Sequence, residues 1–186
     1  LTLQIALSTD QPLRQRFALF LDNHFNTWAG KTGTPSEWGD HLRYQDAGLA
    51  PFGELLRTAI SSPVMLVYLD QQKSFRGRLN ENLARELLEP HTVGVNGGYG
   101  QEDVTALAGL LCGLTVGEEA PPDGGGQYLS RVFRFAPDLA DPAAQRVFGA
   151  RFAEAEGAGA AFDRFGEVLS YLSAHPMTAR FWAHKL

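Results

Sequence analysis

The feature that most constrains this chain is a helical spacing of apolar residues that returns repeatedly along it. Such a stripe covers one face of an α-helix, which then has to be buried against another element. Prolines and capping residues precede several of the striped segments, where the unpaired N–H groups of a helix begin. These helix-start signals are Pro12, Ser62-Pro63, Asn80 and Pro176. The pattern predicts one helix after another.

Four helices are predicted in the first half of the chain. The first follows Ser8-Thr9-Asp10 and ends at Gly30. The continuous apolar run at 64–69 is also compatible with a strand, but its short length and its Ser-Pro entry favour a buried helix. The four helices are expected over 11–29, 37–44, 52–60 and 64–69, with loops at 31–35 and 71–79.

The segment 81–89 has the clearest amphipathic pattern in the sequence. Leu83, Leu87 and Leu88 fall on one side at about 100° per residue, and charged residues fall on the other. Asn80 is expected to cap this helix through its side chain. Pro90 is expected to stop or kink it, because proline removes one backbone hydrogen bond. A glycine-rich turn and a helix over 101–112 follow.

A small amount of β-structure is expected after that helix. Residues 128–135 resemble a strand that pairs with 114–116, and the loop 117–126 is expected to be mobile because it is rich in glycine and proline. Helices resume after Asp141-Pro142 and end with one that starts at Pro176. The predicted fold class is therefore all-α: a single multi-helix domain over 1–186, with one minor β-hairpin near 114–135. The ends of the sequence suggest a fragment of a longer chain.

Composition excludes several functional classes. The 186 residues carry a net charge of −5, and a protein that neutralises phosphates needs a basic face, so no nucleic-acid partner is expected. The single cysteine, Cys112, excludes an internal disulfide and a multi-cysteine zinc site, and its apolar surroundings indicate a small buried side chain. No apolar run is long enough to span a membrane. No particular cofactor is indicated.

Two groups of polar residues are candidate sites. The first lies on the helix 81–89, where Glu81, Arg85 and Glu89 are four residues apart and so face one another. One interpretation is a solvated face with a good cap. The other is a cleft in which carboxylates and amides bind a substrate or a hard cation. The candidate catalytic or metal-binding residues are Glu81 and Glu86, and the candidate binding residues are Asn80, Asn82 and Arg85.

The second candidate group consists of two histidines. His24 lies within the aromatic stripe of the first helix, where it is either a residue at the edge of the core or a ligand or proton carrier. His91 follows Pro90, where it either caps the preceding carbonyl groups or faces the same cleft as Glu86. We therefore treat His24 as a candidate catalytic residue and His91 as a candidate binding residue.

Several stretches of the sequence resemble a known bacterial family, catalogued as domain of unknown function 1800. The family patterns "YLD", "NEN-ARELLELHTLG" and "GYT-x-x-DV" are matched in order by three stretches, and "FWHNHF" and "HPATARF…KL" are matched near the two ends. Asp22 stands where the family has the first histidine of "HNH". The matching stretches are 65–70, 80–94, 98–104, 20–25 and 175–186.

The resemblance implies a mostly helical, longer bacterial protein that is often exported to the periplasm or cell envelope, and it implies no known activity. Two functions are compatible with these observations. The first is a non-catalytic binding or assembly module of an exported or cell-envelope complex, whose partners are other proteins of that compartment. The alternative is a hydrolase, possibly metal-assisted, that uses Glu81, Glu86 and His24. A cleft uniting these three residues would favour the hydrolase, and solvent-facing glutamates would favour the module.

Overall fold

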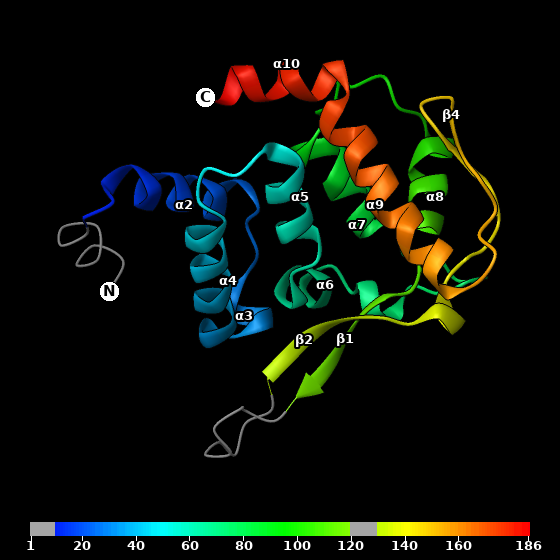
Figure 1. Ribbon diagram of the computed structural model, residues 1–186, viewed down its shortest axis with the longest axis horizontal. Coiled ribbons are helices and arrows are strands. Elements are labelled where there is room, and N and C mark those ends of the chain that lie inside the picture. The colour runs from blue at the N-terminus through cyan, green and yellow to red at the C-terminus, as the bar shows by residue number, and fades with distance from the viewer. Residues whose placement is uncertain (1–9, 120–129) are drawn as a thin grey trace.

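The computed structural model describes residues 10–119 and 130–186, and these residues are mostly helical (Figure 1). The first half of the chain contains helices α2 (Pro12–His24), α3 (Ala29–Thr32), α4 (Thr34–Ala47), α5 (Phe52–Ile60) and α6 (Pro63–Tyr68). After the short 3₁₀ turn η1 (Gln71–Lys73) come α7 (Asn82–Glu86), η2 (Leu87–His91) and α8 (Gln101–Leu110). The last part contains β1 (Leu114–Glu119), β2 (Ser130–Phe135), η3 (Pro137–Leu139), β3 (Gln145–Val147), β4 (Ala150–Phe152), α9 (Ala158–Ala174) and α10 (Pro176–Lys185).

The first helix is shorter than predicted. It ends at His24, and the chain then runs in non-helical conformation to Trp28, whose exposed fraction is 65%. The ring of Trp28 lies so close to Gly30 that a Cβ atom there would sit 2.4 Å from it, so Gly30 permits this packing rather than ending the first helix. The expected loop at 31–35 is also wrong, because α3 and α4 occupy most of it. Only Gly33, with φ of +92°, separates them.

Helices α5 and α6 form where they were predicted. The α5 bounds coincide with 52–60, and Ser62 caps α6 by accepting hydrogen bonds from the backbone N–H groups of Val64 and Met65, at 3.0 and 3.4 Å. The apolar run after Ser62 is therefore a buried helix and not a strand.

The helix that begins near Asn80 does not stop at Pro90. Asn80 Oδ1 accepts a hydrogen bond from the Asn82 backbone N–H at 3.0 Å. The side-chain bond predicted for Asn80 is therefore present, although Asn80 lies two residues before the start of α7 and the N-cap position itself is Glu81. The helix then widens into the π-helix η2, which contains Pro90 and ends at His91. A π turn shifts the hydrogen-bond partner by one residue, and this spacing accommodates a proline that an α-helix would not.

The predicted β-hairpin is present, and a second hairpin was missed. In the first, β1 and β2 are antiparallel, with Leu114 opposite Phe135. The part of the expected mobile loop at 120–126 lies outside the described residues. In the second, β3 and β4 pair around Phe148 and Gly149, whose φ angles are +50° and +76°. Two successive positive φ angles are typical of a tight hairpin turn, and three-residue strands give almost no periodic signal.

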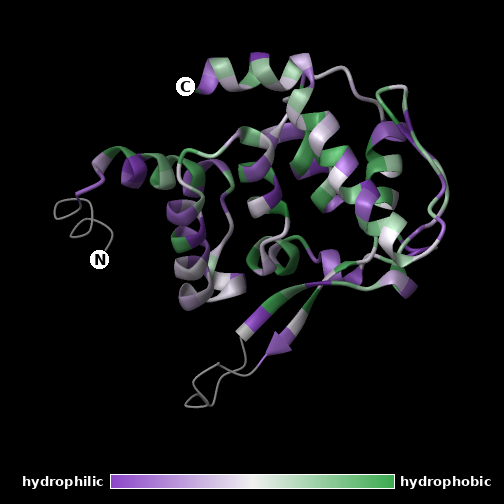
Figure 2. Cartoon of the chain, viewed as in Figure 1, coloured by the Kyte–Doolittle hydropathy of each residue, from purple (hydrophilic) through white to green (hydrophobic). Residues whose placement is uncertain are grey.

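A continuous core joins these elements. Figure 2 shows that hydrophobic residues concentrate in the central helices. The largest fully buried side chains come from helices throughout the chain and from β1, and they include Leu56, Met65, Leu87, Leu107 and Phe165. Cys112 is buried, as predicted. Within residues 10–119 and 130–186, no helix combines the length and the apolar character needed to cross a membrane.

Candidate functional site

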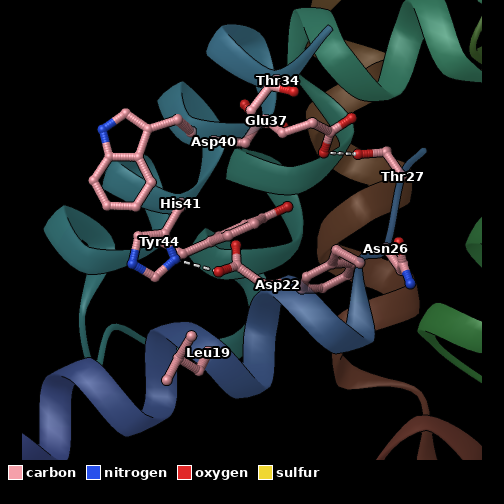
Figure 3. Close-up of a pocket in the computed structure, with 11 residues that line it drawn as sticks. Leu19, Asp22, Asn26, Thr27, Thr34, Glu37, Asp40, His41 and Tyr44 are labelled. Carbon is pink, nitrogen blue, oxygen red and sulfur yellow. Dashed lines mark hydrogen bonds and ion pairs between the residues drawn. The ribbon is translucent and has the colours of Figure 1, made fainter. Parts of the chain in front are cut away.

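A cavity of about 330 Å³ lies between α2 and α4 (Figure 3). Three of its lining residues are carboxylic acids, namely Asp22, Glu37 and Asp40. Aromatic rings line it as well, and two of them, Phe25 and Tyr44, are stacked with centroids 5.9 Å apart. The other lining residues are Leu19, Asn26, Thr27, Thr34, Trp38 and His41. The cavity therefore combines negative charge with aromatic walls.

One face of α4 supplies most of these side chains. Glu37, Asp40, His41 and Tyr44 follow the spacing i, i+3, i+4, i+7, which places them on one side of a helix. That side faces α2, which contributes Asp22. The sequence-based prediction for this segment was only a short helix over 37–44, and none of these side chains was a candidate site residue. The spacing of its acidic, histidine and aromatic residues was the signal that would have found it.

His41 is held in one orientation by partners on α2. Its Nδ1–H donates to Asp22, and its Nε2 accepts from the side-chain amide of Gln15 at 3.1 Å. The oxygen of Gln15 in turn accepts from Gln45. Figure 3 shows His41 and Asp22 facing each other across the space between the two helices. Both ring nitrogens of His41 are therefore engaged, and Asp22 is the cavity-facing end of a hydrogen-bonded chain.

The other two carboxyl groups are also held by hydroxyl donors. Glu37 accepts hydrogen bonds from Thr27 and Thr32, one on each carboxylate oxygen. Asp40, with an exposed fraction of 7%, accepts from the Ser62 hydroxyl. Burial raises the pKa of Asp40 to about 6. Burial also raises the pKa of Asp22, although its hydrogen bond to His41 acts in the opposite direction.

The candidate residues on α7 form a network at the protein surface. Glu81 accepts hydrogen bonds from Arg85 at 2.9 Å, from Gln101 at 2.9 Å and from Thr105 at 3.0 Å. These bonds, that from Gln101 above all, lower the pKa of Glu81. Burial raises the pKa of Glu86, and the neighbouring Glu89 adds to the effect. The predicted Glu81–Arg85 pair is present, and it joins α7 to α8.

The two candidate amides near this network differ in their surroundings. The Asn80 side chain donates to the backbone carbonyls of Leu69 and Asp70, both at 3.0 Å, besides capping α7. Asn82 begins α7, and its backbone N–H is the group that Asn80 caps. Asn80 therefore fixes the end of α6 against the start of α7.

The two candidate histidines, 67 positions apart in the sequence, lie together in the structure. The rings of His24 and His91 are 5.5 Å apart and both side chains are buried. His24 Nε2 lies 3.4 Å from the backbone oxygen of His91, and Lys185 Nζ lies 3.0 Å from His24 Nδ1. Burial lowers the pKa of His24 to about 4 and that of His91 to about 3.

The structure thus separates the candidates into two groups. The hydrogen-bond partners of Glu81 are Arg85, Gln101 and Thr105, whereas those of His24 are His91 and Lys185. In the described part of the chain, no three histidine, cysteine or acidic side chains are arranged to hold a metal ion.

The chain matches the model of a known protein family. A family model with the description "Protein of unknown function (DUF1800)" matches residues 1–186. No curated protein and no solved structure matches the chain.

Proposed function

This chain belongs to the DUF1800 family of proteins of unknown function, and on that premise we propose that it is a non-catalytic binding or assembly module of an exported or cell-envelope complex. We further propose that the cavity between α2 and α4 receives a positively charged side chain, lysine or arginine, of its protein partner. Export to the envelope rests on the family resemblance. The proposal that the ligand is a positively charged side chain is based on the residues that line the cavity.

The cavity is suited to an organic cation. Asp22, Glu37 and Asp40 place three carboxyl groups around it, and Phe25, Trp38 and Tyr44 add aromatic rings. Ammonium and guanidinium groups bind carboxylates through charge-assisted hydrogen bonds and are attracted to the faces of aromatic rings. Its volume of about 330 Å³ lies at the small end of the range for ligand pockets, which fits one side chain of a partner.

The observation that carries the proposal is that the polar groups of this cavity are already engaged within the protein. Both ring nitrogens of His41 and both carboxylate oxygens of Glu37 have partners. A general base needs a lone pair directed at the reacting proton, and His41 has none to offer. A rigid set of carboxylates instead provides a preorganised charge for recognition.

Binding of small amide derivatives tests this proposal. We expect N-acetyl-lysine methylamide and N-acetyl-arginine methylamide to shift the NMR signals of the Trp38 indole, and N-acetyl-norleucine methylamide to leave them unchanged. Asp22→Asn and Asp40→Asn are each expected to weaken binding about tenfold, which corresponds to about 1.4 kcal/mol. Asp163→Asn, on an exposed face of α9, is the control. Equal binding of the norleucine compound would disprove cation recognition.

The alternative proposal is a hydrolase, possibly metal-assisted, that uses Glu81, Glu86 and His24. The observation in its favour is the raised pKa of Glu86, because a carboxyl group with a raised pKa is better suited to act as a general acid. It has less support than the binding module because Glu81 and His24 belong to separate networks. Elemental analysis of the purified protein tests it, since a stoichiometric metal lost in both Glu81→Gln and Glu86→Gln would favour the hydrolase.

A further inference from the structure

The three lysines of this chain have different surroundings. Lys31 and Lys73 both form ion pairs with Asp70, each at 2.8 Å. Lys185, on the last turn of α10, has no carboxylate at ion-pair distance within the described residues. Its amino group instead lies 3.0 Å from Nδ1 of His24 and 5.0 Å from the centre of the Phe181 ring. Within the described residues, Lys185 is thus the lysine whose amino group contacts an imidazole and no carboxylate.

The protonation of His24 follows from its two contacts. Its Nε2 is 3.4 Å from the backbone oxygen of His91, and because a carbonyl oxygen only accepts, Nε2 carries the hydrogen. In the neutral ring, Nδ1 is then left with a lone pair, which points to the amino group of Lys185. His24 is therefore oriented as a hydrogen-bond acceptor, and a potential base, for this lysine.

The carbonyl group that orients His24 is itself fixed. His91 is the last residue of the π-helix η2, and its oxygen also accepts a hydrogen bond from the Trp182 indole at 3.1 Å. The rings of Phe25 and Trp182 pack on His24 with centroid distances of 4.6 and 4.3 Å. Helical distortions of this kind are frequent at functional sites. The imidazole has no room to turn away from Lys185.

We propose that Lys185 is a nucleophilic amine that captures a small aldehyde as an imine, with His24 as the base that takes its proton and the His91 carbonyl as the group that orients His24. A nucleophile within hydrogen-bond reach of a base, which a third group orients, is the arrangement by which proteins activate weak nucleophiles. This site is separate from the cavity between α2 and α4, so the inference does not depend on the proposed function.

The reaction balances without a further reagent. The neutral amine of Lys185 attacks the aldehyde carbon, so that a C–N bond forms and the π electrons of the carbonyl move to oxygen. His24 carries the two protons of the amine, one after the other, to that oxygen, which leaves as water. The product is an imine between Lys185 Nζ and the former carbonyl carbon.

Burial and access both agree with this role. Desolvation lowers the pKa of Lys185, and the lowered pKa of His24 keeps its ring neutral at physiological pH. The Phe181 ring acts in the opposite direction, because it favours the charged ammonium. Lys185 is an exposed residue, whereas His24 is buried. A small aldehyde therefore reaches the amine from solvent while the base stays in a dry environment.

Chemical trapping tests the inference with internal references. The protein is treated at pH 7 with propanal and sodium cyanoborohydride, which reduces each imine to a stable secondary amine, and peptide mapping by mass spectrometry gives the rate at each lysine. We expect Lys185 to be modified several-fold faster than Lys73, because His24 lies within hydrogen-bond distance of its amino group as a base and because desolvation lowers the pKa of Lys185. Equal rates at the two lysines would overturn the proposal, and this comparison requires no variant.

Two variants separate the roles of the two histidines. In His24→Gln, the amide can donate to the His91 carbonyl and accept from Lys185, but it cannot take up a proton, so we expect the rate at Lys185 to fall to that of Lys73. His91→Phe keeps the backbone carbonyl and is expected to keep the fast rate. An unchanged rate in His24→Gln would show that His24 is not the base, and loss of the fast rate in a folded His91→Phe protein would show that the carbonyl alone is not the orienting group.

Discussion

Asp40 shows how a single residue connects burial to the pH dependence of stability. Its carboxyl group is buried, accepts a hydrogen bond from Ser62, and lies 3.6 Å from Arg43. These partners reduce the cost of burial but do not remove it, because the pKa of Asp40 is still raised to about 6. The folded state therefore binds the proton of Asp40 more tightly than the unfolded state does.

That difference predicts the behaviour of Asp40→Asn. A raised folded-state pKa gives stability that is fully present below the unfolded pKa of 3.8 and is lost as the pH rises through about 6. Asp40→Asn has no carboxyl group that can ionise at this position, so the variant does not lose stability as the pH rises. We expect Asp40→Asn to gain stability relative to the parent between pH 4 and pH 7.5, by up to about 3 kcal/mol for a shift of about two units.

Urea unfolding of both proteins at the two pH values measures this gain. Asp163→Asn, which removes an exposed carboxylate from α9, is the control and is expected to show no such trend. A difference between Asp40→Asn and the parent that stays constant with pH would mean that Asp40 titrates normally.

At the scale of elements, the packing of α7 and η2 depends on apolar contacts more than on charges. Leu83, Leu87 and Leu88 are fully buried, as the amphipathic pattern predicted. Arg85 lies on the opposite face, where it joins α7 to α8 through Glu81 and Gln101. Two aspartates of neighbouring elements have other partners: Asp70 pairs with Lys31 and Lys73, and Asp103 accepts from two backbone N–H groups.

Leu87→Ala is expected to lower the free energy of unfolding by about 2–5 kcal/mol. The loss arises because the leucine is removed from a fully packed site and leaves a cavity. Val95→Ala is the matched control, since this apolar side chain is 70% exposed and its truncation is expected to stay within about 0.5 kcal/mol. Denaturant titration measures both. Similar losses in the two variants would contradict the assignment of Leu87 to the core.

Arg85→Ala is expected to cost less than about 1 kcal/mol, because its side chain is 42% exposed and ion pairs of this kind are screened by solvent. Arg85→Lys is expected to restore part of the loss at low salt and nothing at high salt. Thermal unfolding at two salt concentrations measures this. A loss of about 3 kcal/mol or more would indicate a buried pair and would contradict the surface position of this network.

For the whole molecule, the response to acid is the sum of opposing contributions. Because the pKa values of His24 and His91 are lowered in the folded state, the unfolded state binds more protons between about pH 3 and the usual histidine value of 6.5. These two histidines therefore lower the stability of the folded protein as the pH falls through that range. The raised pKa values of Asp22 and Asp40 act in the opposite direction. The pH dependence of stability in the parent protein therefore does not separate the histidine contribution from the aspartate contribution.

His91→Phe isolates the histidine contribution. We expect the variant to become steadily more stable relative to the parent as the pH is lowered from 7 to 4, because it no longer carries a buried group that must stay neutral. Urea unfolding at pH 7, 5.5 and 4 measures the trend. His184→Gln, at an exposed position on α10, is expected to follow the parent at every pH, and the same flat response in His91→Phe would contradict the assignment.

Much of the secondary structure could be predicted from the sequence, whereas little of the candidate site could. The bounds of α5, the capped start of α6 and the β1–β2 pairing all follow from local patterns. The predicted stop or kink at Pro90 takes the form of a π turn, which contains the proline and ends at His91. The β3–β4 hairpin was missed because its strands are only three residues long. Asp22 and His41 were not predicted as partners, since nothing in the sequence indicates which helix packs against α4.

The sequence by itself determined which segments become helices and which of their faces are buried, because neighbours within a helix are set by its fixed pitch of 3.6 residues per turn. Only the tertiary structure decided which faces meet. It brought His24 to His91 and Lys185, it closed the acidic cavity between α2 and α4, and it made Arg164 of α9 donate to backbone carbonyls between Asp141 and Ala153. These contacts join residues far apart in the chain, and their distances depend on how the whole core packs and not on any local spacing.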